Sequence, residues 1–271
     1  MEARVNGIRI NYQVDGPENG ASVVLHHPIA TNLTIWDELT AALTPRYRVV
    51  RFDARGHGQS EAPAGPYKFE TLAADVVALM DHLKIDRAHY LGLSIGGMVG
   101  QHLGLDHAKR FRSLQLVATT SRVPPEGKQM WHDRIVAARE KGMAPQAPAT
   151  LQRWLTESSR KKPELVVRFT KMIETTPVEG FAGWCQAIPT LNVTERIKAI
   201  TLPTQVISGA EDQGTPPAAG ETIHRQIAGS SFVVIPGVAH MLCAEDPATF
   251  HRHVLAFLDK QAGPAGQRSG A

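Results

Sequence analysis

Over the first 120 residues, the hydrophobic positions alternate between two spacings. Short apolar runs that end in polar, glycine or proline residues predict strands. They lie at residues 5–14 (two strands that turn at Asn6-Gly7), 22–26, 47–52, 88–93 and 113–118. Apolar residues at helical spacing predict helices over 71–83 and from about 95 to 106. Short buried strands that alternate with helices are typical of a parallel sheet covered by helices on both faces.

The pattern changes after residue 121. Residues 124–188 show helical patterns broken by prolines and a glycine, with no convincing strand. Strand patterns return at 204–208 and 231–235, and a last helix is predicted over 247–258. The change favours a helical insertion within one α/β core over a separate domain.

These patterns predict an α/β fold with one mostly parallel sheet of eight strands. The expected parts are a core of residues 1–121 and 189–262, a helical cap of residues 122–188 inserted after the sixth strand, and a flexible tail of residues 263–271. The tail is expected because its residues are small and polar and cannot form an apolar core.

The composition is that of an ordinary globular protein and argues against several partners. The chain is 42% hydrophobic and 20% charged, with a net charge of +3. Its densest basic run, Arg160-Lys161-Lys162, has no aromatic residues between the charges, so a solvated helix end explains it better than a nucleic-acid site. No apolar run approaches the roughly 18 residues of a membrane span, and the first residues lack the pattern of a signal peptide.

The two cysteines, Cys185 and Cys243, have no metal-ligand spacing and cannot make a disulfide framework. We interpret both as small buried hydrophobes, with Cys243 also considered as a wall of a pocket. A reducing cytoplasm is the expected compartment. The oligomeric state is not readable from the sequence.

The stretch HYLGLSIGGMVG (89–100) places one serine, Ser94, between glycines where a strand ends and a helix begins. In this Gly-x-Ser-x-Gly pattern, a sharp turn lifts the serine hydroxyl clear of the sheet. The chain passes close on both sides, so Gly92 and Gly96 lack side chains for steric reasons, and Gly97 lets the helix lie close to the strand. The pattern is frequent by chance, so its position between a strand and a helix carries the prediction that Ser94 is a nucleophile.

A nucleophilic serine needs a histidine base, and the base needs an orienting acid. His240 lies between the last strand and the last helix, at the sheet edge where open α/β sheets bind ligands. The strand at 204–208 leads into Glu211 and Asp212, and we prefer Asp212 because its Gly-x-x-acid loop lets it turn back over that edge. Taken alone, Asp212 is better explained as a turn residue. Together with Ser94 and His240, it predicts a Ser-His-Asp triad.

On these residues the chain resembles the α/β-hydrolase superfamily over about residues 3–260, and within it the 3-oxoadipate enol-lactonases. FDARGHGQS (52–60) is similar to a structural turn of the superfamily. VVLHHPIATNLTIW (23–36) is similar to its oxyanion loop, and QMWHDRIVAAREKGM (129–143) to the cap segment of the enol-lactonases. The resemblance implies an α/β-hydrolase fold and cleavage of a lactone or carboxylic ester through an acyl-enzyme, with no metal and no organic cofactor.

The resemblance also implies an oxyanion hole made by the backbone N–H groups of Ile29 and Ile95. Such donors contribute about 2.7–4 kcal/mol each. Most relatives have His-Gly, or a small polar pair, where this chain has His27-Pro28. Proline has no N–H, but the donor falls one residue later. We therefore expect the hole to be kept and the acyl pocket to differ in shape.

A substrate carboxylate, as in the enol-lactones, would be matched by a cation in the cap. The candidate is Arg134, three residues after Trp131 on the same expected helix face. Arg134 is equally well explained as a surface arginine that covers apolar cap surface, and Trp131 is either packing within the cap or a wall of the pocket. Trp154 and Trp184 are expected in the interior of the cap.

Other classes share these features. The same triad serves general carboxylesterases, C–C bond hydrolases and cofactor-free perhydrolases, whereas aspartate-nucleophile dehalogenases and epoxide hydrolases are disfavoured because Ser94 occupies the elbow. Some proteins of this fold are ligand receptors with little turnover, and the complete triad argues against that class. The expected partner is a small-molecule ester or lactone, with no nucleic acid and no membrane.

Overall fold

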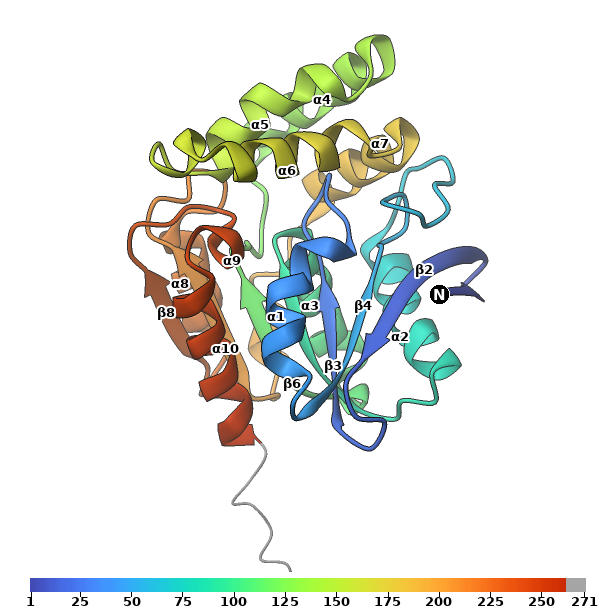
Figure 1. Ribbon diagram of the computed structural model, residues 1–271, viewed down its shortest axis with the longest axis vertical. Coiled ribbons are helices and arrows are strands. Elements are labelled where there is room, and N and C mark those ends of the chain that lie inside the picture. The colour runs from blue at the N-terminus through green and yellow to red at the C-terminus, as the bar shows by residue number, and fades with distance from the viewer. Residues whose placement is uncertain (262–271) are drawn as a thin grey trace, which may run out of the picture.

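The computed structural model describes residues 1–261, and the tail expected at 263–271 lies outside them. Its eight strands form one sheet in the order β1-β2-β4-β3-β5-β6-β7-β8 (Figure 1). The strands are β1 (Glu2–Val5), β2 (Ile8–Asp15), β3 (Ala21–His26), β4 (Tyr47–Phe52), β5 (Ala88–Leu93), β6 (Phe111–Val117), β7 (Thr204–Gly209) and β8 (Ser231–Ile235). The pairs β1–β2 and β2–β4 are antiparallel, and all other neighbouring strands are parallel.

The central strands are buried along their whole length, as a parallel sheet with two covered faces requires. Every residue of β5 and of β7 is buried, whereas β8 at the sheet edge is fully buried only at Ile235. The strands predicted from the sequence are confirmed to within two residues at each end, except that β1 begins at Glu2, ahead of the expected segment. The predicted mostly parallel sheet is therefore correct.

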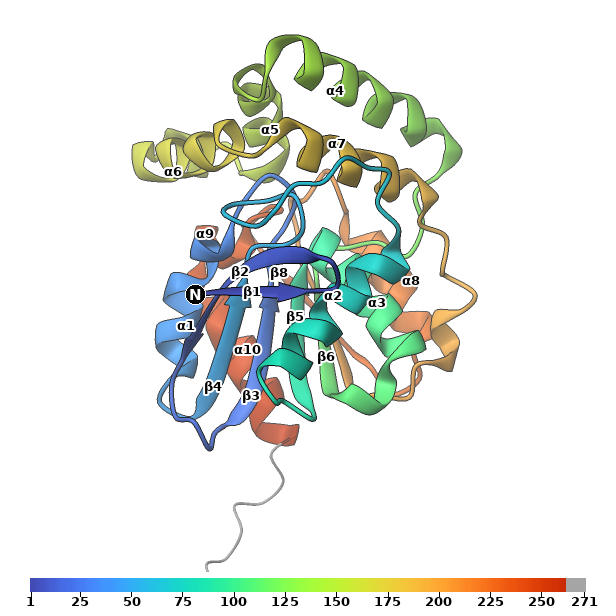
Figure 2. The same ribbon diagram turned by 90° about the vertical axis from the view of Figure 1, so that its right-hand side faces the viewer.

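Helices cover both faces of the sheet (Figure 2). On one face lie α1 (Asp37–Leu43) and α10 (Pro247–Gln261), and on the other lie α2 (Phe69–His82), α3 (Ile95–Asp106) and α8 (Pro217–Gln226). The helices α2, α3 and α10 match predictions, whereas α1 and α8 bury too few apolar side chains for a clear pattern. None of the helices in residues 1–261 combines the length and apolar character that crossing a membrane requires.

Four helices form the insertion between β6 and β7. They are α4 (Lys128–Lys141), α5 (Ala147–Trp154), α6 (Pro163–Glu174) and α7 (Val178–Ala187). They lie over the carboxyl ends of the parallel strands, at the top of Figure 1. The expected helical insertion after the sixth strand is thus confirmed, while its boundaries at residues 122 and 188 stay a prediction.

The insertion and the sheet share one apolar interior. Trp184 of α7 is fully buried, and its indole Nε1 donates a 2.8 Å hydrogen bond to the carbonyl of Arg55, in the turn after β4. Cys185 and Cys243 are buried, unpaired thiols, as expected. The four inserted helices are therefore packed onto the sheet edge rather than standing apart from it.

Candidate active site

Ser94 lies at the tip of the turn between β5 and α3, as the sequence predicts. Its backbone angles, φ 58° and ψ −112°, are rare for any residue except glycine, and its N–H donates to the carbonyl of Val117 at 2.8 Å. A Cβ at Gly92 would overlap the backbone of Gly96, and one at Gly96 would lie 2.5 Å from the carbonyl oxygen of His26. Both glycines are therefore required by the close approach of neighbouring backbone.

Asp212 and His240 are both buried and form a hydrogen bond to each other. His240 Nδ1 lies 2.7 Å from Oδ2 of Asp212. When Nδ1–H donates to the carboxylate, Nε2 is left to accept a proton. Asp212 follows β7, and His240 lies between β8 and the short helix α9 (Leu242–Glu245). Two strand ends thus bring together the two residues that the sequence analysis paired.

Three further hydrogen bonds reach the Asp212 carboxylate. Oδ1 accepts from the N–H groups of Gly214 at 2.8 Å and Thr215 at 3.0 Å, and Oδ2 accepts from the Thr215 hydroxyl at 2.7 Å. Burial opposes ionisation of Asp212, but the neighbouring His240 and the two hydrogen bonds from Thr215 outweigh it and lower the Asp212 pKa. Sequence reasoning missed Thr215, although aspartate commonly binds N–H groups two and three residues further on.

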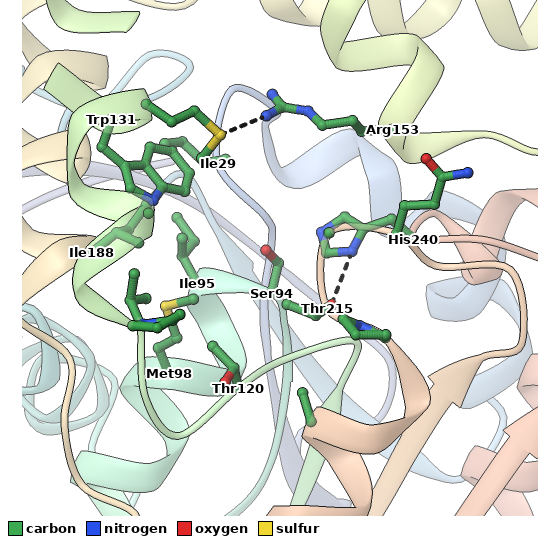
Figure 3. Close-up of a pocket in the computed structure, with 18 of the residues that line it drawn as sticks. Ile29, Ser94, Ile95, Met98, Thr120, Trp131, Arg153, Ile188, Thr215 and His240 are labelled. Atoms are coloured by element: carbon green, nitrogen blue, oxygen red, sulfur yellow. Dashed lines mark hydrogen bonds between the residues drawn. The ribbon is translucent and has the colours of Figure 1, made fainter. Parts of the chain in front are cut away.

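Ser94 and His240 both line a cavity of about 420 Å³ between the sheet edge and the inserted helices (Figure 3). The indole of Trp154 stacks over the His240 ring, with the ring centroids 6.4 Å apart and an interplanar angle of 22°. The hydrogen bonds of residues 1–261 link His240 to Asp212 and Thr215 but not to Ser94. A nucleophile–base contact of this kind often becomes short only when a substrate binds.

The two expected oxyanion donors, Ile29 and Ile95, line the same cavity. Ile95 is the first residue of α3, so its N–H has no acceptor within the helix and lies at the positive end of the helix dipole. Ile29 lies in the loop that follows β3. Within residues 1–261, no backbone or side-chain group accepts a hydrogen bond from the Ile29 N–H. Both N–H groups thus belong to residues that line the cavity with Ser94, which leaves their role as oxyanion donors a prediction.

Trp131 and Arg134 of α4 also line the cavity. The Arg134 guanidinium lies 5.0 Å from the ring centroid of Trp131 and 5.0 Å from that of Phe181, and it donates to the Thr150 hydroxyl at 3.3 Å. Burial lowers the Arg134 pKa to about 10. No carboxylate of residues 1–261 forms an ion pair with it. Arg134 is therefore a half-buried cation that lines the cavity.

Sequence reasoning missed Arg153 and did not place Trp154 at the cavity. These are the last two residues of α5, and both line the cavity. Trp154 is also buried against α6, in the interior of the cap as expected. The Trp154 carbonyl accepts from the N–H of Met241 at 3.1 Å, which holds this helix end beside the His240 loop. Arg153 donates to the sulfur of Met130 at 3.4 Å, and burial lowers its pKa. No motif in the sequence marks either residue, because only the docking of α5 brings them to the cavity.

The other histidines downstream of Ser94 are not among the residues that line the cavity. His102 stacks on Phe69 with ring centroids 5.0 Å apart, and the Nδ1 of His224 lies 2.8 Å from the Ser230 hydroxyl. Within residues 1–261, no three histidine, cysteine, aspartate or glutamate side chains come together in a way that could hold a metal ion.

The family model of the alpha/beta hydrolase fold matches residues 21–247, and the chain belongs to this family. It is 31% identical over 254 residues to 3-oxoadipate enol-lactonase 2 of Acinetobacter baylyi, an alignment that covers 93% of this chain and 94% of the relative. The solved enol-lactonase of Burkholderia xenovorans LB400 is similar with a TM-score of 0.92 and 38% identity, over 96% of this chain and 100% of that one. A malate-bound thermophilic esterase of Thermogutta terrifontis has a TM-score of 0.91 and 28% identity, over 96% and 99%.

Proposed function

We propose that the protein is a serine hydrolase that cleaves a carboxylate-bearing lactone, or a related carboxylic ester, through an acyl-enzyme. The observation that carries the proposal is the buried 2.7 Å hydrogen bond between Asp212 and His240. His240 lines the same cavity as Ser94. Each of these residues follows a different strand, in the order serine, acid, histidine that is typical of this fold.

In the first half-reaction, His240 acts as the general base. Its Nε2 takes the hydroxyl proton while Ser94 Oγ attacks the carbonyl carbon, and the carbonyl π electrons move onto the oxygen. The N–H groups of Ile29 and Ile95 donate to this oxyanion. Asp212 accepts the hydrogen bond from Nδ1–H, holds the tautomer and stabilises the imidazolium.

Collapse of the tetrahedral intermediate breaks the bond to the leaving oxygen, which takes the proton from His240. In a lactone, the leaving oxygen stays attached to the acyl chain. A water molecule then gives a proton to Nε2 and attacks the acyl carbon, and a second collapse releases the acid and returns the proton to Ser94. These steps balance without a metal or an organic cofactor.

Two half-buried cations favour an anionic substrate. Arg134 and Arg153 line the same cavity, and neither forms an ion pair with a carboxylate of residues 1–261. Burial lowers the Arg134 pKa, and the charge of Arg153 lowers it further. A charge that is partly withdrawn from water without a counterion is unfavourable, and a substrate carboxylate would relieve this cost. The similar proteins agree with an anionic ligand. Two are named enol-lactonases, and the esterase was solved with malate, a dicarboxylate.

A second candidate function is that of a general carboxylesterase, which the similarity to the Thermogutta terrifontis esterase favours. It uses the same triad and oxyanion donors, and it differs in giving no advantage to an anionic substrate. A ligand receptor would need no activated nucleophile, so the hydrogen bond between Asp212 and His240 favours an enzyme.

Labelling with a fluorophosphonate and mapping the labelled peptide tests the nucleophile. We expect label on Ser94 in the wild-type protein and none in Ser94→Ala, with the same circular dichroism spectrum. Turnover of an enol-lactone with a free carboxylate, of its methyl ester and of neutral aryl esters separates the two functions. Preference for the free acid supports the lactonase, and equal rates indicate a general esterase. Near-normal turnover by Ser94→Ala would refute the assignment of the nucleophile.

A further inference from the structure

We infer that His27, Thr31 and His57 are positioning residues that clamp the oxyanion loop, so that the Ile29 N–H points into the cavity. The inference rests on the proposed function, because it concerns the oxyanion of that reaction. All three side chains are buried, and none is among those that line the cavity. They act through the backbone of residues 28–30, not through contact with a substrate.

The carbonyl oxygen of Pro28 is held by two of these side chains. His27 Nδ1 lies 2.8 Å from it, and the Thr31 hydroxyl donates to it at 2.7 Å. The Pro28 carbonyl and the Ile29 N–H belong to the same planar trans peptide, so they point in opposite directions. With the carbonyl fixed toward His27 and Thr31, the N–H is directed away from them, and Ile29 itself lines the cavity.

A third hydrogen bond places the proton of His27. The N–H of Ala54 donates to His27 Nε2 at 2.9 Å, so Nε2 carries no proton and Nδ1 is the donor to Pro28. His27 is 0% exposed, and burial lowers its pKa, which keeps the ring neutral. A charged ring would carry a proton on Nε2 and lose the hydrogen bond from Ala54. The ring is therefore held in one tautomer.

His57 holds the next peptide of the loop. The N–H of Ala30 donates to His57 Nε2 at 2.9 Å. Ala30 has φ 54°, a left-handed conformation that non-glycine residues rarely adopt, so it needs support from its surroundings. His57 Nδ1 lies 3.3 Å from the carbonyl of Arg55, which also accepts from Trp184 Nε1 at 2.8 Å. The carbonyl of Arg55 thus holds both His57, which supports the loop, and Trp184 of the inserted helix α7.

A loosened clamp should weaken the oxyanion hole and spare substrate binding. A hydrogen bond weakens steeply as its angle departs from linear, and an N–H that rocks spends less time aimed at the oxyanion. Removing an oxyanion donor altogether lowers kcat by about 10²–10³-fold. Loss of one of the two hydrogen bonds to Pro28 leaves the donor in place but mobile, so a smaller effect of about 10-fold is expected.

Thr31→Val tests the clamp, because valine has the shape of threonine but no hydroxyl, while Thr31→Ser keeps the hydroxyl. We expect Thr31→Val to lower kcat about 10-fold at a near-constant KM. Labelling by a fluorophosphonate should slow equally, because its phosphoryl oxygen occupies the oxyanion hole. Thr31→Ser should stay within about twofold of wild type. The matched control is Ser113→Ala, which removes a buried 2.8 Å hydrogen bond to His89. This bond lies at the amino ends of β5 and β6, away from the cavity, so its loss should lower Tm only.

Unchanged kcat and labelling in Thr31→Val would overturn the inference, and so would an equal loss in Thr31→Ser, which indicates packing. If Thr31→Val does not fold, His57→Gln and His57→Leu give the same comparison, since only glutamine accepts from Ala30. The clamp then predicts that His57→Gln keeps more kcat than His57→Leu, and equal values contradict it. A wild-type protein that is not labelled on Ser94 ends the proposed function and the clamp together. A labelled, active wild type beside an unaffected Thr31→Val ends the clamp alone.

Discussion

The carboxylate of Asp212 shows how its neighbours decide the chemistry of a single side chain. Burial disfavours its charge, yet His240 and the two hydrogen bonds from Thr215 lower its pKa. The other acid of this loop, Glu211, lies one position earlier and is exposed. Residue identity alone therefore does not separate the two acids, and the surrounding donors do.

Asp212→Asn should lower kcat by about 10⁴-fold with little change in the fold, because an amide facing Nδ1 holds the imidazole in the wrong tautomer. Steady-state kinetics on an ester or lactone substrate measures this. Glu211→Gln is the matched control and should keep its activity. A comparable loss in Glu211→Gln would contradict the choice of the acid.

Buried histidines make the stability depend on pH. Burial, with the neighbouring His27, lowers the His26 pKa to about 3, and burial with nearby arginines lowers the His89 pKa to about 4. The unfolded chain titrates near its ordinary value of about 6.5. Below that pH the unfolded state binds more protons, so the free energy of unfolding decreases as the pH falls from about 6.5 toward 4.

His89→Gln should flatten this dependence by up to about 1.4 kcal/mol per pH unit between pH 6.5 and 4. The reason is that the variant lacks one group that takes up a proton on unfolding. Urea denaturation at several pH values in this range measures the slope. A slope equal to that of the wild type would mean that His89 keeps an ordinary pKa in the folded protein.

At the scale of elements, hydrophobic spacing in the sequence reveals the inward face of α6 but not that of α4. The apolar residues of α6 that face inward recur at helical spacing and include Leu165, Phe169 and Ile173. Only Ile135 and Ala138 of α4 are buried, because the face of this helix that carries Trp131 and Arg134 turns toward the cavity. The hydrophobic pattern of α4 therefore cannot separate a cavity face from a solvent face.

Arg134→Gln and Arg153→Gln should each raise KM for a carboxylate-bearing lactone by about 10–100-fold, the value of a hydrogen bond to a charged group. The methyl ester of the same lactone should be unaffected. Lys141→Gln, at the exposed end of α4, removes a charge without touching the cavity and is the matched control. Equal effects on the acid and on the ester would rule out a role in binding the carboxylate.

At the scale of the whole molecule, Glu245 of α9 ties the inserted helices to the His240 loop. Its Oε1 accepts from the N–H and the hydroxyl of Thr156, both at 2.8 Å, and its Oε2 accepts from the N–H of Ala239 at 2.6 Å. Thr156 follows α5, and Ala239 directly precedes His240. The placement of the helices above the cavity is thereby coupled to that of the base.

Glu245→Ala should lower the free energy of unfolding by roughly 2–4 kcal/mol and reduce kcat, because three hydrogen bonds to a charged group are lost together. Urea denaturation and kinetics measure the two effects. The control is Glu179→Ala, which breaks the exposed 2.8 Å ion pair with Arg139 within the insertion and should change the stability little, because water screens this pair. A Glu245→Ala protein as stable and active as this control would show that the insertion and the loop dock independently.

The sequence by itself determined the strands of the sheet, the helices α2, α3 and α10, the helical insertion and the candidates Ser94, Asp212 and His240. These features are local, since hydrophobic spacing marks an element and each candidate lies in the turn or loop that follows a predicted strand. The tertiary structure alone decided that Trp154 and Arg153 face the cavity and that His27 and Thr31 hold the carbonyl of Pro28. Such placements depend on how α5 docks and how the loop after β3 folds, and contacts between packed side chains and backbone leave no periodic signal in the chain.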